Sequence, residues 1–200
     1  MHDLEPYYNW RDEYIASEDP KSPFFEKEYS EFTFSEKIYN HFIHPQWDDF
    51  GSSTLYCKIL YADYFHKVVI IELIGEWNDA INNDIMILKR DLADHFFNEG
   101  ICKFIIIGEN ILNFHSSEDA YYEEWYEDAS EEGGWIALLN FRTHILEQMD
   151  EVNLSHYINY PEELQNIFWR KQKPLQLTKT VEAILFSNSL PEFQDYELIN

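Results

Sequence analysis

Four consecutive apolar residues, Phe104–Ile107, constrain the fold of this chain more than any other segment. A strand that is apolar at every position is typical of a parallel sheet, in which both faces of each inner strand are covered. Parallel neighbours need crossover connections, which are usually helices. A second apolar run, Val68–Ile71, comes before it, and both runs are far shorter than the roughly 20 residues of a membrane span. The sequence therefore predicts a soluble α/β protein that does not enter a membrane.

The segments around these two runs complete the predicted sheet. Leu55–Phe65 and Lys67–Gly75 are β-rich and meet at His66–Lys67, which predicts an antiparallel hairpin. Apolar residues at helical spacing predict an amphipathic helix over 79–99, and Trp135–Leu139 predicts a further strand. We expect a mixed sheet of four to five strands, with Lys67–Gly75 and Phe104–Ile107 central and parallel. The helices should lie mainly on one face.

Further elements are expected from capping residues and local periodicity. Ser117 is predicted to be the N-cap of a helix that runs to about Ser130, because acids at the next two positions favour the positive end of a helix dipole. The other predicted elements are a helix over 143–152, a short edge strand over 155–158, and helices over 162–171 and 178–186.

Charge divides the chain into parts and excludes some classes of partner. The 200 residues hold 14 Lys and Arg against 38 Asp and Glu, a formal net charge of −24. This sign opposes binding to nucleic acid or to an anionic membrane through diffuse charge, and favours a basic protein partner. Residues 1–53 are predicted to form an acidic, aromatic-rich extension that packs on the body. An α/β domain over 54–173 and a C-terminal helix and tail over 174–200 follow.

Neither the cysteines nor the histidines indicate a metal or a cofactor. Cys57 and Cys102 are too few for a disulfide framework or a four-thiolate metal site, and no apolar leader opens the chain, so we expect a cytoplasmic protein. His41 and His44 precede two aspartates, but nothing supplies the remaining ligands of a metal site. No P-loop or dinucleotide-binding glycine pattern is present. We therefore predict no metal and no cofactor.

Three segments together resemble the STAS domain, the fold of anti-sigma factor antagonists and of the cytoplasmic domains of sulfate transporters. Leu73–Asn78 is similar to the strand end L-x-G-x-L-D of that family, with Asn78 in place of the usual aspartate. Phe104–Glu118 is similar to its strand and loop V-V-L-D-L-S-x-V-x-F-I-D-S-S-G without a gap. Gly134–Leu139, followed by an amphipathic helix, is similar to the Gly-led strand and the third helix of the family. The resemblance covers roughly residues 54–170 and implies a STAS-like fold.

The resemblance also implies a phosphorylation switch. In the antagonists, the serine at the position of Ser117 is phosphorylated by a partner kinase, and this switches binding off. Ser117 is accordingly the candidate phosphoacceptor, with Ser116 as its neighbour. His115 and Glu118 depart from the family pattern, in which an aspartate and a glycine hold these positions. Glu118 would place a carboxylate beside the phosphate and oppose the modification.

The segment Glu118–Glu132 holds eight acids and no base, with aromatic residues along one side of the predicted helix. One interpretation is that the aromatic rings pack on the sheet while the acids are solvated. The other is an acidic, aromatic docking surface for a basic protein. The residues predicted to contact such a partner are His115, Glu118, Asp119, Tyr122 and Trp125.

These observations predict a non-enzymatic regulatory or protein-interaction module. One alternative is a hydrolase-like enzyme in which His115 and nearby acids act on a substrate, although no G-x-S-x-G motif accompanies them. Another alternative is a structural subunit in which the N-terminal extension closes a homodimer.

Overall fold

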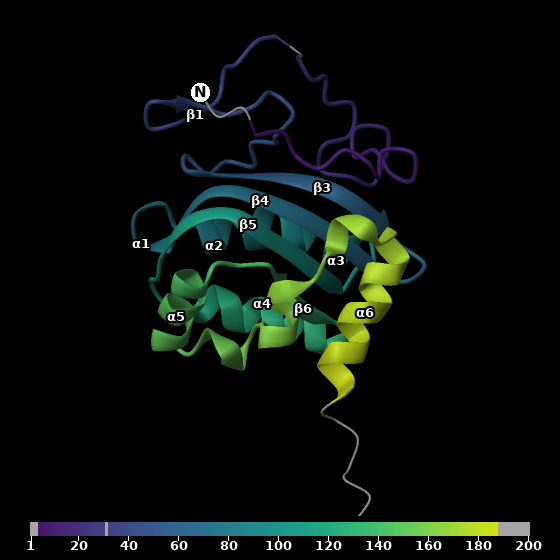
Figure 1. Ribbon diagram of the computed structural model, residues 1–200, viewed down its shortest axis with the longest axis vertical. Coiled ribbons are helices and arrows are strands. Elements are labelled where there is room, and N and C mark those ends of the chain that lie inside the picture. Colours follow the sequence, from purple (N-terminus) through teal and green to yellow (C-terminus); the bar gives the residue numbers. More distant parts are fainter. Residues whose placement is uncertain (1–3, 31, 188–200) are drawn as a thin grey trace, which may run out of the picture.

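The computed structural model, which describes residues 4–30 and 32–187, is built around a four-stranded sheet (Figure 1). The strands are β3 (Leu55–Asp63), β4 (Val68–Asn78), β5 (Lys103–His115) and β6 (Trp135–Leu139), in the spatial order β3-β4-β5-β6. β3 runs antiparallel to β4, while β4, β5 and β6 are parallel. The predicted mixed sheet, with its central parallel pair, is confirmed.

β4 and β5 are longer than the sequence predicted, and this length positions the loops at their carboxyl ends. Pairing continues to Asn78 and His115, which are direct partners. β5 contributes one extra residue at each of two register shifts, near Glu72 and near Gly75. Such bulges increase the local twist of a strand. The apolar run alone did not indicate the second half of β5, because polar residues alternate irregularly after Ile107.

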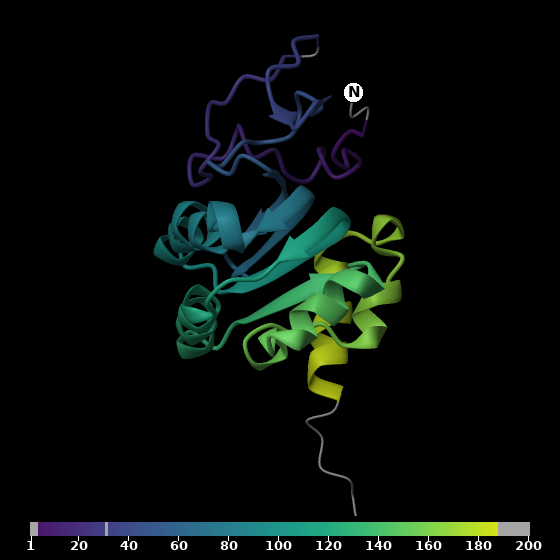
Figure 2. The ribbon, with the colours of Figure 1, turned by 90° about the vertical axis from the view of Figure 1, so that its left-hand side faces the viewer.

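One face of the sheet is covered by the helices that connect the parallel strands and by the helix that follows β6. They are α1 (Asp79–Asn82), α2 (Asp84–Ile87), the π-helix η1 (Leu88–Ala93), α3 (Asp94–Asn98), α4 (Ala120–Glu131) and α5 (Thr143–Glu151). In Figure 2 the teal helices lie to one side of the strands and yellow α6 to the other. The helix predicted over 79–99 is interrupted, because Asn83 adopts a left-handed conformation with φ of 53° between α1 and α2.

The C-terminal segment covers the opposite face with η3 (Glu162–Asn166), η4 (Trp169–Lys171) and α6 (Pro174–Ser187). The helix predicted over 162–171 is wrong: Ile167 is extended, with ψ of 128°, and separates two 3-10 turns so that Leu164, Ile167 and Trp169 are all buried. α6 begins four residues earlier than predicted, at a proline, which suits a first helical turn. The predicted tail beyond Ser187 lies outside the described residues.

The edge strand predicted over 155–158 is also wrong. Residues Leu154–His156 form a 3-10 turn, η2, and only Asn159 makes a parallel bridge, to Ala137. Asn159 donates its N–H to Ile136 and accepts from Leu138. Pro161 follows and has no N–H to continue the ladder, so the pairing ends after one residue.

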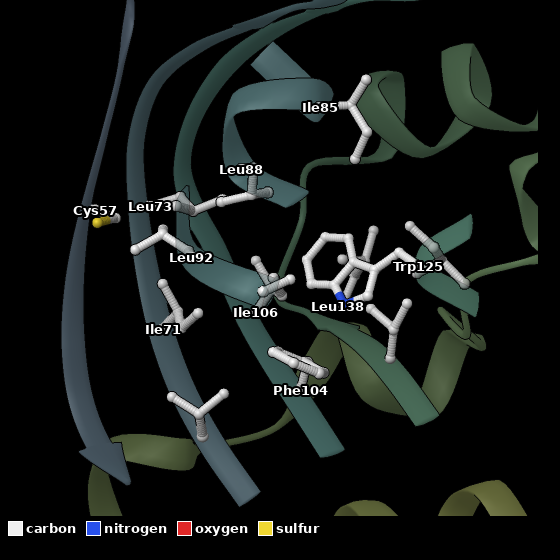
Figure 3. Packing of buried hydrophobic residues seen from close by; sticks show 14 of the residues in the cluster. Cys57, Ile71, Leu73, Ile85, Leu88, Leu92, Phe104, Ile106, Trp125 and Leu138 are labelled. Carbon is white, nitrogen blue, oxygen red and sulfur yellow. The ribbon is translucent and has the colours of Figure 1, made fainter. Parts of the chain in front are cut away.

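Each face of the sheet has its own hydrophobic cluster. On the helical face, Leu88, Leu92 and Trp125 pack against Ile71 and Leu73 of β4, and against Phe104, Ile106 and Leu138 of the next two strands (Figure 3). On the other face, Ile70, Ile105 and Leu139 contact the C-terminal segment and Trp10. The two central strands are thereby buried on both sides, as their apolar sequence requires.

The N-terminal segment, residues 4–50, is largely irregular and lies beside β3 (Figures 1 and 2). Its regular elements are the two-residue strands β1 (Lys37–Ile38) and β2 (His41–Phe42). Asp48 bridges Cys57 on the outer side of β3, and Trp47 is buried near Tyr56. The segment, which we call the arm, therefore protects the exposed edge of the sheet. The division of the chain at residue 53 stays a prediction.

Within residues 4–30 and 32–187, none of the helices has the length and apolar character needed to cross a membrane.

Gly75 is required by its surroundings as well as by its backbone. Its φ is +119°, and a Cβ atom would lie 2.1 Å from the carbonyl oxygen of Thr54 and 2.7 Å from Ile38 Cδ1. We expect Gly75→Ala to lower the free energy of unfolding by about 3 kcal/mol or more, from backbone strain and overpacking together.

Gly100→Ala is the matched control, because Gly100 has φ of +85° but no heavy atom within 4 Å of the position that a Cβ atom would take. Its free energy of unfolding should fall by only about 1 kcal/mol, from backbone strain without overpacking. Chemical denaturation measures both values. Equal losses for the two variants would contradict the role given to the Thr54 contact.

Candidate functional site

The carboxyl ends of β4 and β5 and the loop that leads to α4 form the candidate site. Ligands of α/β proteins commonly bind at this edge of a parallel sheet. His115 ends β5 beside Asn78, and α4 begins at Ala120. His115, Ser117 and Glu118 are exposed, while Ser116 is half-buried. The loop therefore presents the predicted serine and its acidic neighbours to the solvent.

The predicted N-cap at Ser117 is wrong. The cap is Asp119, whose carbonyl accepts the first helical hydrogen bonds from the N–H groups of Tyr122 and Glu123. The side chain of Asp119 makes no capping bond and accepts instead from the Tyr157 hydroxyl at 3.2 Å. Ser117 lies two residues before the cap. The helix dipole acts mainly within the first turn, so it favours a charge at Ser117 less than the sequence suggested.

Two of the residues predicted to contact a partner are inside the protein. Tyr122 is 2% exposed and Trp125 is 1% exposed. The prediction that these two residues contact a partner directly is therefore wrong. Trp125 packs edge-to-face on Phe104 with ring centroids 5.2 Å apart. The buried rings of α4 pack on the sheet while its acids face outward, which agrees with the solvated-helix interpretation of this segment. The burial of Tyr122 also ties α4 to a polar network.

Asp79 is the centre of that network. Its carboxylate accepts hydrogen bonds from the Tyr122 hydroxyl at 2.6 Å, the Trp77 indole N–H at 3.0 Å and the backbone N–H of Ile85 at 2.8 Å. Burial is the main cause that raises the pKa of Asp79 to about 6, against the opposing effect of these bonds. The network joins the end of β4, the crossover helices and α4. It fixes the base of the candidate loop.

Asn78 and Asp84 extend the network to the residues just before β3. The Asn78 side chain accepts from the N–H of Ile81 at 3.0 Å and so caps α1. Asp84 accepts from the Asn78 N–H at 2.7 Å and from the Ser52 hydroxyl at 2.6 Å. Burial raises the pKa of this carboxyl as well. Asn78, a departure from the family pattern in the sequence, thus has a structural role here.

Four of the five acids of α4, together with its N-cap Asp119, divide into two sets by what they contact. Toward the crossover helices, Glu124 makes a two-pronged contact with Arg90, at 2.6 and 2.8 Å. Asp128 binds the ammonium of Lys89 at 2.8 Å, and Asp94 of α3 also contacts this group. The Lys89 side chain has no exposed surface. This set of acids is therefore neutralised within the protein.

The other set surrounds two tyrosines. Asp119, Glu123 and Glu127 are exposed, and among the described residues none of the three forms an ion pair with a base. Tyr126, 44% exposed, lies 6.2 Å from Tyr157 between ring centroids. Desolvation is the main cause that raises the pKa of Tyr157, and the charges of Asp119, Glu123 and Glu127 add to the rise. We call these five residues the acidic tyrosine patch.

Several buried charges were not singled out from the sequence. Glu72, 1% exposed in the middle of β4, accepts from the N–H of Tyr7 at 2.8 Å and from the Asn110 amide at 3.3 Å. Arg170 lies 3.8 Å away. Burial raises the pKa of Glu72 to about 7. The sequence signal for Glu72 was its place as the only acid within the apolar run VVIIELIG. A carboxylate in a strand that is covered on both faces must find hydrogen-bond or ion-pair partners.

His44 of the arm is held by a protein group. His44 Nε2 lies 3.2 Å from Glu5, and the aspartate that follows, Asp48, lies 3.1 Å from both Lys27 and Lys58. Within the described residues, no group of three or more His, Cys, Asp or Glu side chains is arranged to hold a metal ion.

No family model matches the chain, and no curated protein matches it. The solved structures that are similar to this chain include the following two. One is the NMR structure of the protein TM1081, 21% identical, covering 64% of this chain and 90% of its own, with a TM-score of 0.40. The other is a crystal structure described as "a putative anti-sigma factor antagonist (tm1081) from Thermotoga maritima", 15% identical, covering 63% and 92%, with a TM-score of 0.42.

The raised pKa of Asp79 predicts a pH-dependent stability. Because its pKa is about 6 in the folded state against 3.8 ordinarily, the folded protein binds more protons between these values. The free energy of unfolding should therefore fall as the pH rises from about 4 through 6, and Glu72 adds to the fall up to about 7.

Asp79→Asn keeps the acceptor for Trp77 and Ile85 but cannot ionise. We expect the fall in unfolding free energy between acidic and neutral pH to be smaller in this variant, by up to about 3 kcal/mol. Denaturant titrations across this pH range measure it. Asp91→Asn, at an exposed position, is the control for loss of one charge. If Asp79→Asn follows the same pH profile as the native chain, the assignment to Asp79 fails.

Proposed function

We propose that this chain is a non-enzymatic, cytoplasmic regulatory module that binds a basic protein through the acidic tyrosine patch. The observation that carries the proposal is the division of charge on α4. Arg90 and Lys89 neutralise the acids on one side of the helix, whereas Asp119, Glu123 and Glu127 have no such partner in the described part of the chain. Unpaired carboxylates around one exposed and one half-buried tyrosine ring suit recognition of Arg and Lys.

The proposed mode of action is that of a STAS-like antagonist. Its support is the β-β-α-β-α-β order of the chain and the sequence resemblance over residues 104–118. The loop residues His115, Ser116, Ser117 and Glu118 adjoin the patch through Asp119. A partner that covers the patch would therefore also contact the loop, and a change in the charge of the loop would reach the interface.

The charge of the patch is tested by reversing it. The partner is first captured from native cell extract, identified and purified. The double variant Glu123→Lys/Glu127→Lys should then bind it at least about tenfold more weakly than the native chain does. Glu162→Lys/Glu163→Lys is the control, because it makes the same charge change at two exposed residues of η3. Isothermal titration calorimetry at low and high salt gives both affinities. Equal weakening by the two double variants would show only a general charge effect and contradict the patch.

Phosphorylation of Ser117 is the finer part of the proposal. A phosphate adds roughly −1.5 to −2 charges next to Glu118 and Asp119. Repulsion among these groups would move the loop out of the position that fits the partner, and we expect this rearrangement to outweigh the attraction of the added charge for a basic protein. Intact-mass measurement of the protein from its own cells should show one phosphate, absent in Ser117→Ala and retained in Ser116→Ala.

Ser117→Asp should likewise weaken capture of the partner, whereas Ser35→Asp, at an exposed position in the arm, should leave it unchanged. If no phosphate appears under any growth condition and Ser117→Asp binds like the native chain, the protein has no such switch.

A further inference from the structure

We propose that a cavity between the arm and β3 binds a small aromatic carboxylate. The cavity has a volume of about 170 Å³ and lies between residues 6–17 of the arm and residues 58–60 of β3. A cavity of about 150 Å³ is large enough to take benzene. The space therefore fits a molecule with one ring and one small polar group. This site lies on the arm, away from α4, and its argument is independent of the function proposed above.

The walls of the cavity suit an aromatic ring. Tyr7, Trp10 and Tyr14 line it from the arm, and Ile59 and Leu60 line it from the sheet. Tyr7 and Trp10 are already fixed edge-to-face, with ring centroids 5.3 Å apart, and the Trp10 indole donates to the Gln172 carbonyl at 3.0 Å. Aromatic rings prefer such offset and edge contacts with a further ring. The walls are therefore in place before a ligand enters.

The charges of the cavity suit an anion. Its lining includes the cations Arg11 and Lys58 and, among the described residues, no aspartate or glutamate. Arg11 donates to the Gln46 side chain at 3.2 Å and forms no ion pair within the described part of the chain. A guanidinium without a carboxylate partner at the rim of an aromatic cavity is unexpected in a chain of net charge −24. Its planar N–H groups match the two oxygens of a carboxylate.

The second cation is also incompletely neutralised. Asp48 is fully buried behind the cavity and lies 3.1 Å from Lys58 and 3.1 Å from Lys27, while the Tyr29 hydroxyl donates to it at 2.6 Å. One carboxylate thus faces two ammonium groups, and the local charge stays positive. Burial lowers the pKa of Lys58, and a bound anion would act against that change. A single negative charge on the ligand balances the excess.

The experiment uses ligand-observed ¹⁹F NMR on the full chain with 4-fluorobenzoate as the probe and 4-fluorobenzamide as its neutral isostere. We expect saturable binding of the benzoate, and binding of the amide weaker by roughly tenfold or more. Arg11→Gln should weaken binding of the benzoate by a similar factor. Arg142→Gln, at another exposed arginine that forms no ion pair among the described residues, should leave binding unchanged.

Hydrogen exchange locates the binding site. Saturating benzoate should slow exchange in peptides that cover residues 6–17, where the N–H groups of Glu13 and Tyr14 bond to the Trp10 carbonyl, and leave α4 unaffected. Three outcomes would overturn the proposal: no binding of either probe at millimolar concentration, equal binding of both probes, or protection elsewhere in the chain. Equal loss of affinity in the two arginine variants would overturn it too, because it would show binding through general charge only.

Discussion

The parallel pairing of β4 with β5 is the constraint on which the rest of the structure depends. Both strands are apolar on both faces, so neither face can be left to water, and two separate layers must cover them. The crossover helices and α5 cover one face. The C-terminal segment, together with Trp10 of the arm, covers the other. Because the strands are parallel, their carboxyl ends meet at one edge, and this places His115 beside Asn78.

Burying this sheet in so acidic a chain requires that each buried charge has partners. Asp79, Asp84 and Glu72 each accept two or more hydrogen bonds at the point where two elements meet. Lys89 has carboxylates from both α3 and α4 around its ammonium. Removing one partner of such a group generally costs more than the contact itself contributes, because the other partner stays buried. These groups therefore fix how the helices and the arm sit on the sheet, which apolar contacts alone specify less sharply.

Local apolar patterns were sufficient to predict the strands β3 to β6, because each strand contains a run of apolar residues that must be buried on one or both faces of the sheet. They were insufficient where tertiary contacts decide. Asn83 interrupts a helical pattern, and Ile167 is extended so that the residues around it reach the sheet. In the candidate site, the pattern located the serines and acids between a strand and a helix. It could not tell Tyr122 and Trp125, which the sheet buries, from Tyr126, which stays exposed on the same short helix.

The distribution of the few basic residues connects these observations. The chain has 14 bases and 38 acids, so most acids have no base to pair with. The positions of the few bases therefore determine which parts of the surface stay negative. Lys89 and Arg90 neutralise one side of α4, and Lys27 and Lys58 both contact the single carboxylate of Asp48 where the arm meets β3. The result is a negative surface on the outer side of α4 and a locally positive cavity beside β3. These two places therefore favour ligands of opposite charge.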